Sequence, residues 1–224
     1  MAWSLVQQAQ DGVDTGTPSS LTVTFGSTPA PGNIILISAS ETSSLNALIQ
    51  SAADGNGNDA TDINGRQDYD NALCLAQFVL QVPAPASDTI VITTADPDCL
   101  SIYCCISEWS GGSVSTDGTA QAGYIQPGTI GAGDVVTSFA NDIIWTSVAA
   151  AFIAGFSLVS GASLLGQIPG SDATCWLSDA YQVETSAGTY DPQWNCPQNT
   201  GYVLLNTALQ VAAPGSGFFP FFGA

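Results

Sequence analysis

Short apolar and β-branched runs alternate with clusters of Gly, Pro, Asn and Asp along most of this chain. Runs of this length, bounded by turn-forming residues, are typical of β-strands. Their regular spacing predicts an all-β fold, an antiparallel β-sandwich or jelly roll of about ten strands. The clearest runs are Ser20 to Phe25, Asn33 to Ser38, Cys74 to Val82, Asp88 to Thr93, Leu100 to Trp109, Asp134 to Phe139, Asp142 to Ala149, Gly155 to Gly161, Thr174 to Val183 and Gly201 to Ala212.

One segment has a different pattern. The stretch "SSLNALIQSAAD", Ser43 to Asp54, has apolar residues at helical spacing, and Ser43 or Ser44 could serve as its N-cap. It predicts one short helix within the β-fold.

The run from Ile143 to Leu165 has 23 residues without a charge, which is roughly the length that spans a bilayer. Its flanks, Asp142 and Gln167, lack the basic residues that orient a membrane helix. Ser, Thr and Gly recur within it, so we expect two short strands with a turn near Gly155.

The two halves of the chain echo each other at an offset of 101 residues, most clearly where a Cys, a Gln and a Val recur at the end of a predicted strand. The repeated residues are Cys74, Gln81 and Val82, followed by Cys175, Gln182 and Val183. The echo suggests a duplicated four-strand unit, with halves of about 1–112 and 130–213. Both belong to one β-sandwich domain over 1–213, and a tail rich in Gly, Pro and Phe follows at 214–224.

Charge narrows the range of partners. Arg66 is the only cationic side chain against 19 Asp and Glu, which gives the 224 residues a net charge of −18. Nucleic-acid binding needs Lys and Arg to replace counterions, so we expect no nucleic-acid partner, and an anionic membrane is disfavoured for the same reason. The opening "MAWSLVQQAQDG" lacks the features of a secretory signal, so we expect synthesis in a cytoplasm without a signal peptide.

Catalytic chemistry has few residues to draw on. The chain has no His and no Lys, so the usual bases that activate a Ser or Cys nucleophile are absent. Paired carboxylates remain, but many acids lie beside turn formers, such as Asp96 and Asp98 around Pro97. We therefore expect no enzyme activity, no catalytic residue and no cofactor.

A weak calcium pattern lies between Asp54 and Gly65. Asp54, Asn56 and Asn58 occupy positions one, three and five of a calcium-loop spacing, and Asp62 lies one residue beyond position eight. The pattern lacks the central Gly and the final Glu of an EF-hand loop. A plain loop accounts for the same residues.

Six cysteines show no CxxC spacing, and no His completes a mixed zinc site. The internal echo makes Cys74 with Cys99, and Cys175 with Cys196, candidate disulfides. Buried free thiols are the favoured interpretation for a chain made in a reducing compartment. Cys104 and Cys105 should face opposite sides of one strand and so should not pair.

The C-terminal "APGSGFFPFFGA" joins a Pro, Gly and Ser hinge to four phenylalanines, Phe218, Phe219, Phe221 and Phe222. Burying each ring would contribute about 1.5 to 3 kcal/mol, so we expect the tail to pack on something. It packs either on its own domain or on a neighbouring subunit, and the second interpretation makes these residues an interface.

The order of phrases along the chain carries a family resemblance. An opening "WSLVQQAQ" is followed by "TVTFGSTPAPGNIILI", "FVLQVPAPASDTIVIT", "CISEWSG", "ANDIIWTSVAAAF", "GFSLVSG", "AYQVETSAGTYDPQW" and "LLNTALQVA". Over Met1 to Ala213 this resembles the β-sandwich modules of phage virion structural proteins and of related phage-derived bacterial proteins. The resemblance implies a structural or binding module, with no catalytic residues to carry over.

We therefore expect a structural protein of a bacteriophage virion, an acidic capsid decoration or cement protein made in the host cytoplasm. Its partners would be the major capsid protein or other virion proteins, and it would form a homo-oligomer or lattice. Two alternatives stay open. One is a receptor- or glycan-binding module of a tail fibre or spike, for which Trp109, Trp176 and Trp194 are candidates, although the core is the favoured place for each. The other is a self-assembling extracellular filament subunit.

Overall fold

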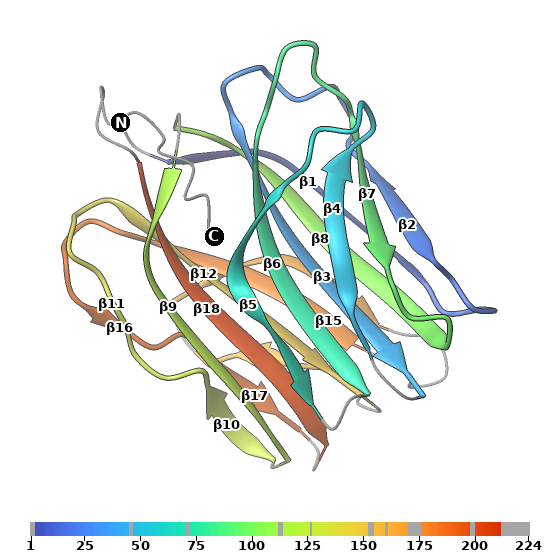
Figure 1. Cartoon of the computed structure of the whole chain (residues 1–224). Helices are drawn as coiled ribbons and strands as arrows, with labels where there is room; N and C mark the ends of the chain where they lie inside the picture. The colour runs from blue at the N-terminus through green and yellow to red at the C-terminus, as the bar shows by residue number, and fades with distance from the viewer. Residues whose placement is uncertain are drawn as a thin grey trace, which may run out of the picture.

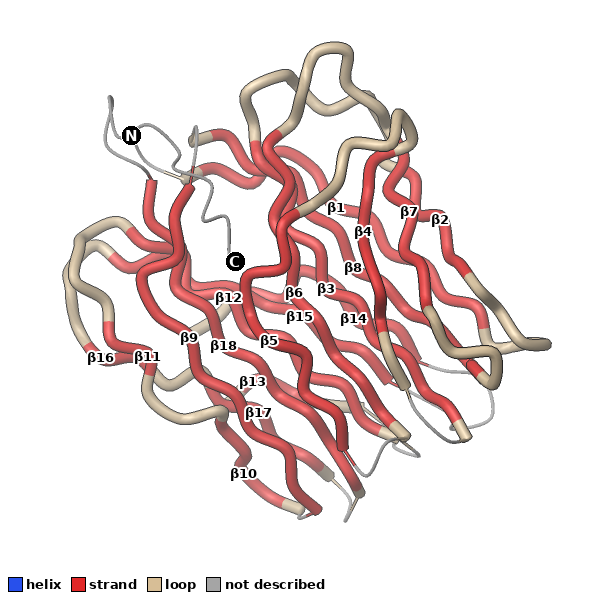
Figure 2. Tube along the Cα trace, viewed as in Figure 1, coloured by secondary structure: helices blue, strands red, loops and turns tan. Residues whose placement is uncertain are grey.

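A computed structural model describes residues 3–44, 47–69, 72–111, 114–125, 127–151, 155–159, 161–169, 176–197 and 200–211. Within these residues the chain forms strands and no helix, so the predicted all-β sandwich is confirmed (Figure 2). The strands are β1 (Ser4–Val13), β2 (Ser20–Thr24), β3 (Ile34–Ser43), β4 (Ile49–Asp54), β5 (Thr61–Tyr69), β6 (Leu73–Gln81), β7 (Thr89–Thr94), β8 (Cys99–Ser110), β9 (Val114–Ile125), β10 (Gly128–Gly131), β11 (Val135–Val136), β12 (Asp142–Ala150), β13 (Ser157–Leu158), β14 (Ser163–Pro169), β15 (Trp176–Glu184), β16 (Thr189–Tyr190), β17 (Gln193–Cys196) and β18 (Gly201–Val211).

Two five-stranded antiparallel sheets form the centre of the molecule. The first inner sheet has the order β1, β8, β3, β6, β5, and the second inner sheet has the order β14, β15, β12, β18, β9. Leu36 and Trp109 of the first share one hydrophobic cluster with Ile143 and Trp145 of the second. The inner sheets therefore pack face to face, with the blue and green first half at the upper right of Figure 1 and the yellow to red second half at the lower left.

Smaller sheets cover the outer faces. The first outer sheet (β2, β7, β4) packs Ile92 in one cluster with Ile37 of the first inner sheet. The second outer sheet (β10, β17, β13) packs Trp194 with Val148 of the second inner sheet. A two-stranded flap (β11, β16) covers another part of that same face. The fold thus has outer, inner, inner and outer layers.

This layering explains the hydrophobic pattern of the strands. All ten residues of β3 are buried, because an inner-sheet strand is covered on both faces and needs no polar side. In β2 only Leu21 and Val23 are buried, and the residues between and beside them are exposed. Such alternation is typical of a sheet with one solvated face.

The two halves of the chain have the same strand order. Reading the second inner sheet backwards gives β9, β18, β12, β15, β14, which matches the first inner sheet position by position. β9 already belongs to the second sheet, although it lies in the interval that the sequence prediction left between the halves. The connectivity therefore repeats from β9 onward, and the jelly-roll detail stays a prediction.

The register of the repeat differs by one residue from the sequence echo. Val79 of β6 and Tyr181 of β15 both pack against the cluster between the inner sheets. If the repeat is aligned on these two residues, Gln81 corresponds to Val183, whereas the sequence echo paired Gln81 with Gln182. A shift of one residue turns a side chain to the other face of a sheet. The sequence echo therefore matched side chains that face outward in one half with side chains that face the other inner sheet in the other half.

The predicted helix over Ser43 to Asp54 is wrong where the structure describes it. β3 continues to Ser43, and Ile49–Asp54 form β4, with Ile49 and Ala52 buried. The register shifts between Ile49 and Ser51, where a β-bulge adds one residue. The bulge brings two residues three positions apart onto one face of a strand, which imitates helical spacing.

The uncharged run also forms strands. It contains β12 from Ile143 onward, β13 and the start of β14, so it takes part in three strands where two were expected, and Gly155 near its middle has a φ of 116°. A side chain is strained at that angle, and a Cβ there would lie 3.0 Å from the ring of Trp176. Among the described residues, no helix is long and apolar enough to cross a membrane.

Candidate functional site

Three buried carboxyl groups are the most unusual chemistry of the described chain. Glu41 lies in β3, Asp142 is the first residue of β12, and Asp179 lies in β15. The exposed fraction of the residue is 0% for Glu41 and Asp142 and 1% for Asp179. Burial raises the pKa of all three, because a charged carboxylate loses its hydration. Arg66 is the only basic side chain of the sequence, so cations for neutralising these groups are scarce.

Asp179 lies between the two inner sheets. Its Oδ1 accepts hydrogen bonds from Trp145 Nε1 at 2.7 Å, Ser147 Oγ at 2.7 Å and Ser38 Oγ at 2.9 Å. Burial raises its pKa to about 7, although these three donors favour the charged form and lower the value. At neutral pH the group is therefore near its midpoint of titration.

The hydrogen-bond network around Asp179 extends through both inner sheets. Gln77 Nε2 donates to Ser147 Oγ at 2.8 Å, and Thr207 Oγ1 donates to Gln77 Oε1 at 2.6 Å. Asn64 Nδ2 donates to Thr207 Oγ1 at 3.0 Å. The network crosses from β6 and β5 to β12 and β18, so it fixes how the two sheets align. It is enclosed, and a substrate would have no path to it without separating the sheets.

Glu41 lies near one end of the first inner sheet. Its Oε2 accepts hydrogen bonds from Thr94 Oγ1 at 2.6 Å and from the Leu48 N–H at 3.0 Å, whereas its Oε1 is buried without a partner. After burial, the nearby Asp96 carboxylate also raises the pKa of Glu41. Burial and Glu41 together raise the pKa of Cys99 to about 12, so this thiol stays protonated and unreactive at neutral pH.

The cysteines do not follow the candidate disulfide pairing where they are described. Cys99, Cys104 and Cys105 are buried free thiols, so Cys74 and Cys99 are not joined. Cys104 packs in the outer core of the first half and Cys105 between the inner sheets, which confirms that neighbouring residues face opposite sides. In the other candidate pair, Cys196 is buried and Cys175 lies outside the described residues.

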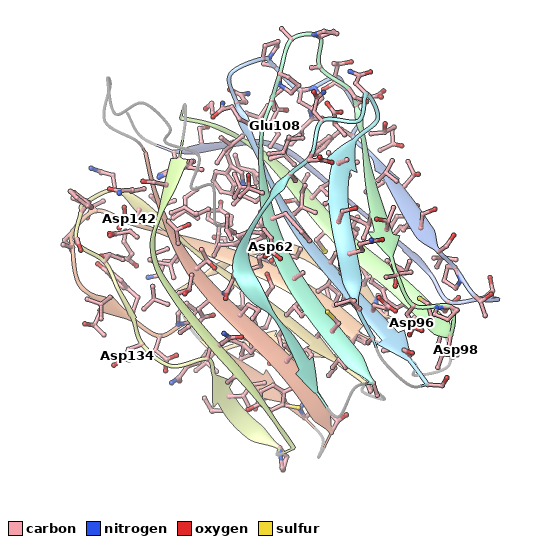
Figure 3. The ribbon with its side chains drawn as sticks, in the orientation of Figure 1. Asp62, Asp96, Asp98, Glu108, Asp134 and Asp142 are labelled. Carbon is pink, nitrogen blue, oxygen red and sulfur yellow. The ribbon has the colours of Figure 1, made fainter. Side chains whose placement is uncertain are left out.

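The calcium-like loop is held by its own hydrogen bonds. Asp54 Oδ1 accepts from the backbone N–H groups of Asn56 and Asn58, each at 2.9 Å. The Asn58 amide N–H₂ donates to both Asp54 oxygens, at 3.0 and 2.9 Å, so donors already satisfy the carboxylate that would bind calcium. Asp62 follows in β5 with an exposed side chain (Figure 3). Nowhere in the described part do three or more acidic, Cys or His side chains form a group that could hold a metal.

Two tryptophans considered for glycan binding lie in the core. Trp109 and Trp194 are 1% and 0% exposed, and the indole of Trp194 donates to Thr146 Oγ1 at 2.9 Å. Trp176 is partly buried and donates to Ser178 Oγ at 3.0 Å. The four candidate interface residues, Phe218, Phe219, Phe221 and Phe222, lie outside the described residues.

Sequence reasoning did not single out Glu41, Asp142 or Asp179. The available signal was an acid inside or beside a continuous apolar and small-residue run, as in "IILISASET", "NDIIWTS" and "WLSDAYQV". A strand with such a pattern is covered on both faces, so its acid is buried as well. Glu108 has the same type of context, but three donors satisfy it: Gln7 Nε2 at 2.6 Å, Asn33 Nδ2 at 2.6 Å and Ala30 N at 2.8 Å (Figure 3).

The arrangement thus consists of acids inside a layered β-sandwich, with one hydrogen-bonded network joining its halves. Comparisons with protein-family models, with curated proteins and with solved structures found no match to this chain.

Proposed function

We propose that the protein is a non-enzymatic structural subunit of a phage particle, a capsid decoration or cement protein that acts through protein–protein contacts. Its partners are the major capsid protein or other virion proteins, and it works as a homo-oligomer or lattice. The proposal rests on the sequence resemblance and on where the fold places its ionisable side chains.

The observation that carries the proposal is the enclosure of the ionisable groups whose pKa values are raised. A general acid must come within hydrogen-bonding distance of its substrate. Glu41, Asp142 and Asp179 have at most 1% of their surface exposed, so the groups best tuned for proton transfer cannot reach one. The chain also has no His or Lys to supply another base. Function is therefore assigned to the outer surface.

Rigidity is the second support. The inner sheets share a hydrophobic core and the network around Asp179, so a load on one half is transmitted to the other through many buried contacts. In the proposed role, this block bridges neighbouring coat subunits and resists their separation. The net charge of −18 keeps free copies apart until they dock.

Copy number tests the proposal. Purified virions are digested and the ratio of this protein to the major coat protein is measured by quantitative mass spectrometry. The copy number of a decoration protein should be close to a simple fraction of the copy number of the coat protein. A few copies per particle would instead indicate the tail-fibre alternative, and absence from virions would overturn the proposal. Long polymers of the purified protein alone would indicate the filament alternative.

The aromatic tail gives a second test. Deleting Gly215 to Ala224 should reduce binding to particles that lack the protein, because Phe218, Phe219, Phe221 and Phe222 are proposed to anchor in a neighbouring subunit. The melting temperature of the free protein should change little. Binding is measured by co-sedimentation with these particles, and full-length protein is the control. Unchanged binding with a lowered melting temperature would show that the tail packs on its own domain.

A further inference from the structure

Phe139 and Val136 expose apolar surface at the flap formed by β11 and β16. Phe139 is 54% exposed, whereas every other aromatic side chain that the structure describes is buried or partly buried. Val136 of β11 is 61% exposed. Aromatic residues are enriched at protein interfaces, but single exposed apolar residues are also normal on a surface. The surroundings of this pair therefore decide whether it marks an interface.

Hydrogen bonds hold the backbone that carries this pair. Asp117 Oδ2 accepts from the N–H groups of Ser138 at 2.6 Å and Phe139 at 3.3 Å. The Thr137 N–H donates to the Gly188 carbonyl at 2.8 Å, and the Gly188 N–H donates to Thr137 Oγ1 at 3.0 Å. Because both sides of the segment are fixed before a partner arrives, docking here orders little additional backbone.

Acidic side chains surround the pair. Asp117 contacts the backbone of Phe139, Asp134 is exposed just before β11, and Glu184 ends β15 opposite the start of β12. Figure 3 shows Asp134 on the left side of the molecule, where Figure 1 places the flap. The only cationic side chain of the sequence, Arg66, belongs to β5 of the other inner sheet. Two copies that met through this surface would bring like charges together, which disfavours a second copy as the partner.

The C-terminal tail leaves the domain at the same corner. β18 ends at Val211, just beyond Leu209, which pairs with Ile143 of β12. The segment after Phe139 leads directly into β12, and Figure 1 shows the flap beside β9 and β18. Residues 212–224, which follow Val211, carry four phenylalanines and no charged side chain. A partner that holds this tail is therefore brought next to Phe139.

We propose that the flap corner, made of Val136 and Phe139 with the acidic Asp117 and Asp134, is the surface of the domain that docks on the major capsid protein. The inference rests on the proposed function as a decoration subunit, and it specifies the chemistry of the partner. The coat site is an apolar pocket rimmed by Lys and Arg. Phe139 fills the pocket, and the acids attract the cations and speed association.

The test measures binding of the full-length protein to particles that lack it, by co-sedimentation and by the rates of association and dissociation. Phe139→Ser should weaken binding roughly tenfold or more, because it removes the central apolar contact. Its melting temperature should equal that of the parent, since the side chain is exposed. Asp134→Asn should mainly slow association, and the parent should bind more weakly as NaCl rises from about 50 to about 500 mM. Val136→Ser gives the answer should Phe139→Ser fail to fold.

Leu164→Ser is the matched control. Leu164 is 49% exposed, but it lies in β14, at the edge of the second inner sheet opposite β9. This variant should bind as the parent does. If the parent binds the particles and the variants at Phe139 and Val136 bind equally well, the flap corner is overturned while the decoration role stands. Equal loss in Leu164→Ser, or binding that does not depend on salt, would also overturn it.

Two further outcomes separate this inference from the proposal on which it rests. A parent that neither binds the particles nor occurs in virions would overturn the decoration role, and the flap corner with it. A parent that forms dimers in sedimentation equilibrium, which Phe139→Ser converts to monomers, would show that a second copy covers this surface. That result would overturn the coat protein as the partner.

Discussion

Asp179 shows how a single residue can set the pH dependence of the whole fold. Its pKa is about 7 in the folded chain against an ordinary 3.8, so the folded state holds a proton that the unfolded state releases. Such a group contributes stability fully below about pH 4, and that contribution is lost as the pH rises through 7. Asp142 acts in the same direction, with a pKa of about 6.

We therefore predict that the free energy of unfolding is higher at pH 5 than at pH 8. The part due to Asp179 is at most about 3 kcal/mol, because only the two pH units between pH 5 and its folded pKa of about 7 contribute. Asp179→Asn should remove most of this difference, because a neutral amide oxygen can still accept from Trp145, Ser147 and Ser38. Urea denaturation at both pH values measures the effect, with the exposed Asp134→Asn as a control. Equal pH dependence in parent and Asp179→Asn would contradict the prediction.

The sequence pattern predicts the central strands of the inner sheets but not their edge strands. The predicted runs include the six central strands, among them β3, β8 and β12, but none of the edge strands β1, β5, β9 and β14. Central strands are covered on both faces and read as continuous apolar runs, whereas edge strands carry polar residues and so resemble loops. β1, with the sequence "SLVQQAQDGV", shows this clearly.

The candidate sites were hidden for a related reason. In β9 a bulge leaves Asp117 without a partner in the register, and another bulge near Gln50 produced the spacing that predicted the wrong helix. A bulge depends on the partner strand, which is remote in sequence, so local periodicity does not reveal it. The enclosed acids could have been suspected from their strand context, but their partners could not.

The edges of the inner sheets are joined by a side-chain amide, and this contact can be tested. Gln10 of β1 donates to the Gln167 carbonyl at 3.0 Å and accepts from the Gln167 N–H at 2.9 Å, as a neighbouring strand would. Gln10→Ala should lower the free energy of unfolding by about 1 kcal/mol. Gln8→Ala, on the same exposed face of β1, should leave it unchanged. Equal effects in urea denaturation would show that the amide contact contributes nothing.

At the scale of the whole molecule, the two halves should unfold together. Each half has an outer core of its own, but the cluster that contains Leu36, Trp109, Ile143 and Trp145 belongs to both. Separating the halves would expose this cluster and leave the acceptor Asp179 without Ser38. The repeated strand order therefore does not imply independent folding.

We predict one calorimetric transition, with equal calorimetric and van't Hoff enthalpies. Leu36→Ala should lower the free energy of unfolding by about 2 to 5 kcal/mol and shift the whole transition without splitting it. Leu36→Met, which keeps the volume, should cost less than about 1.5 kcal/mol. A second peak in either protein would show that the halves are separate folding units.

The adjacent thiols of Cys104 and Cys105 can report on how the layers of the molecule separate. Cys104 lies beneath the first outer sheet and Cys105 between the inner sheets, and burial raises the pKa of both well above the ordinary value. A thiol-reactive dye can reach the first only when the outer layer lifts, and the second only when the halves part. Comparing the labelling rates of Cys104 and Cys105 would therefore distinguish lifting of the first outer sheet from separation of the two inner sheets, without an engineered probe.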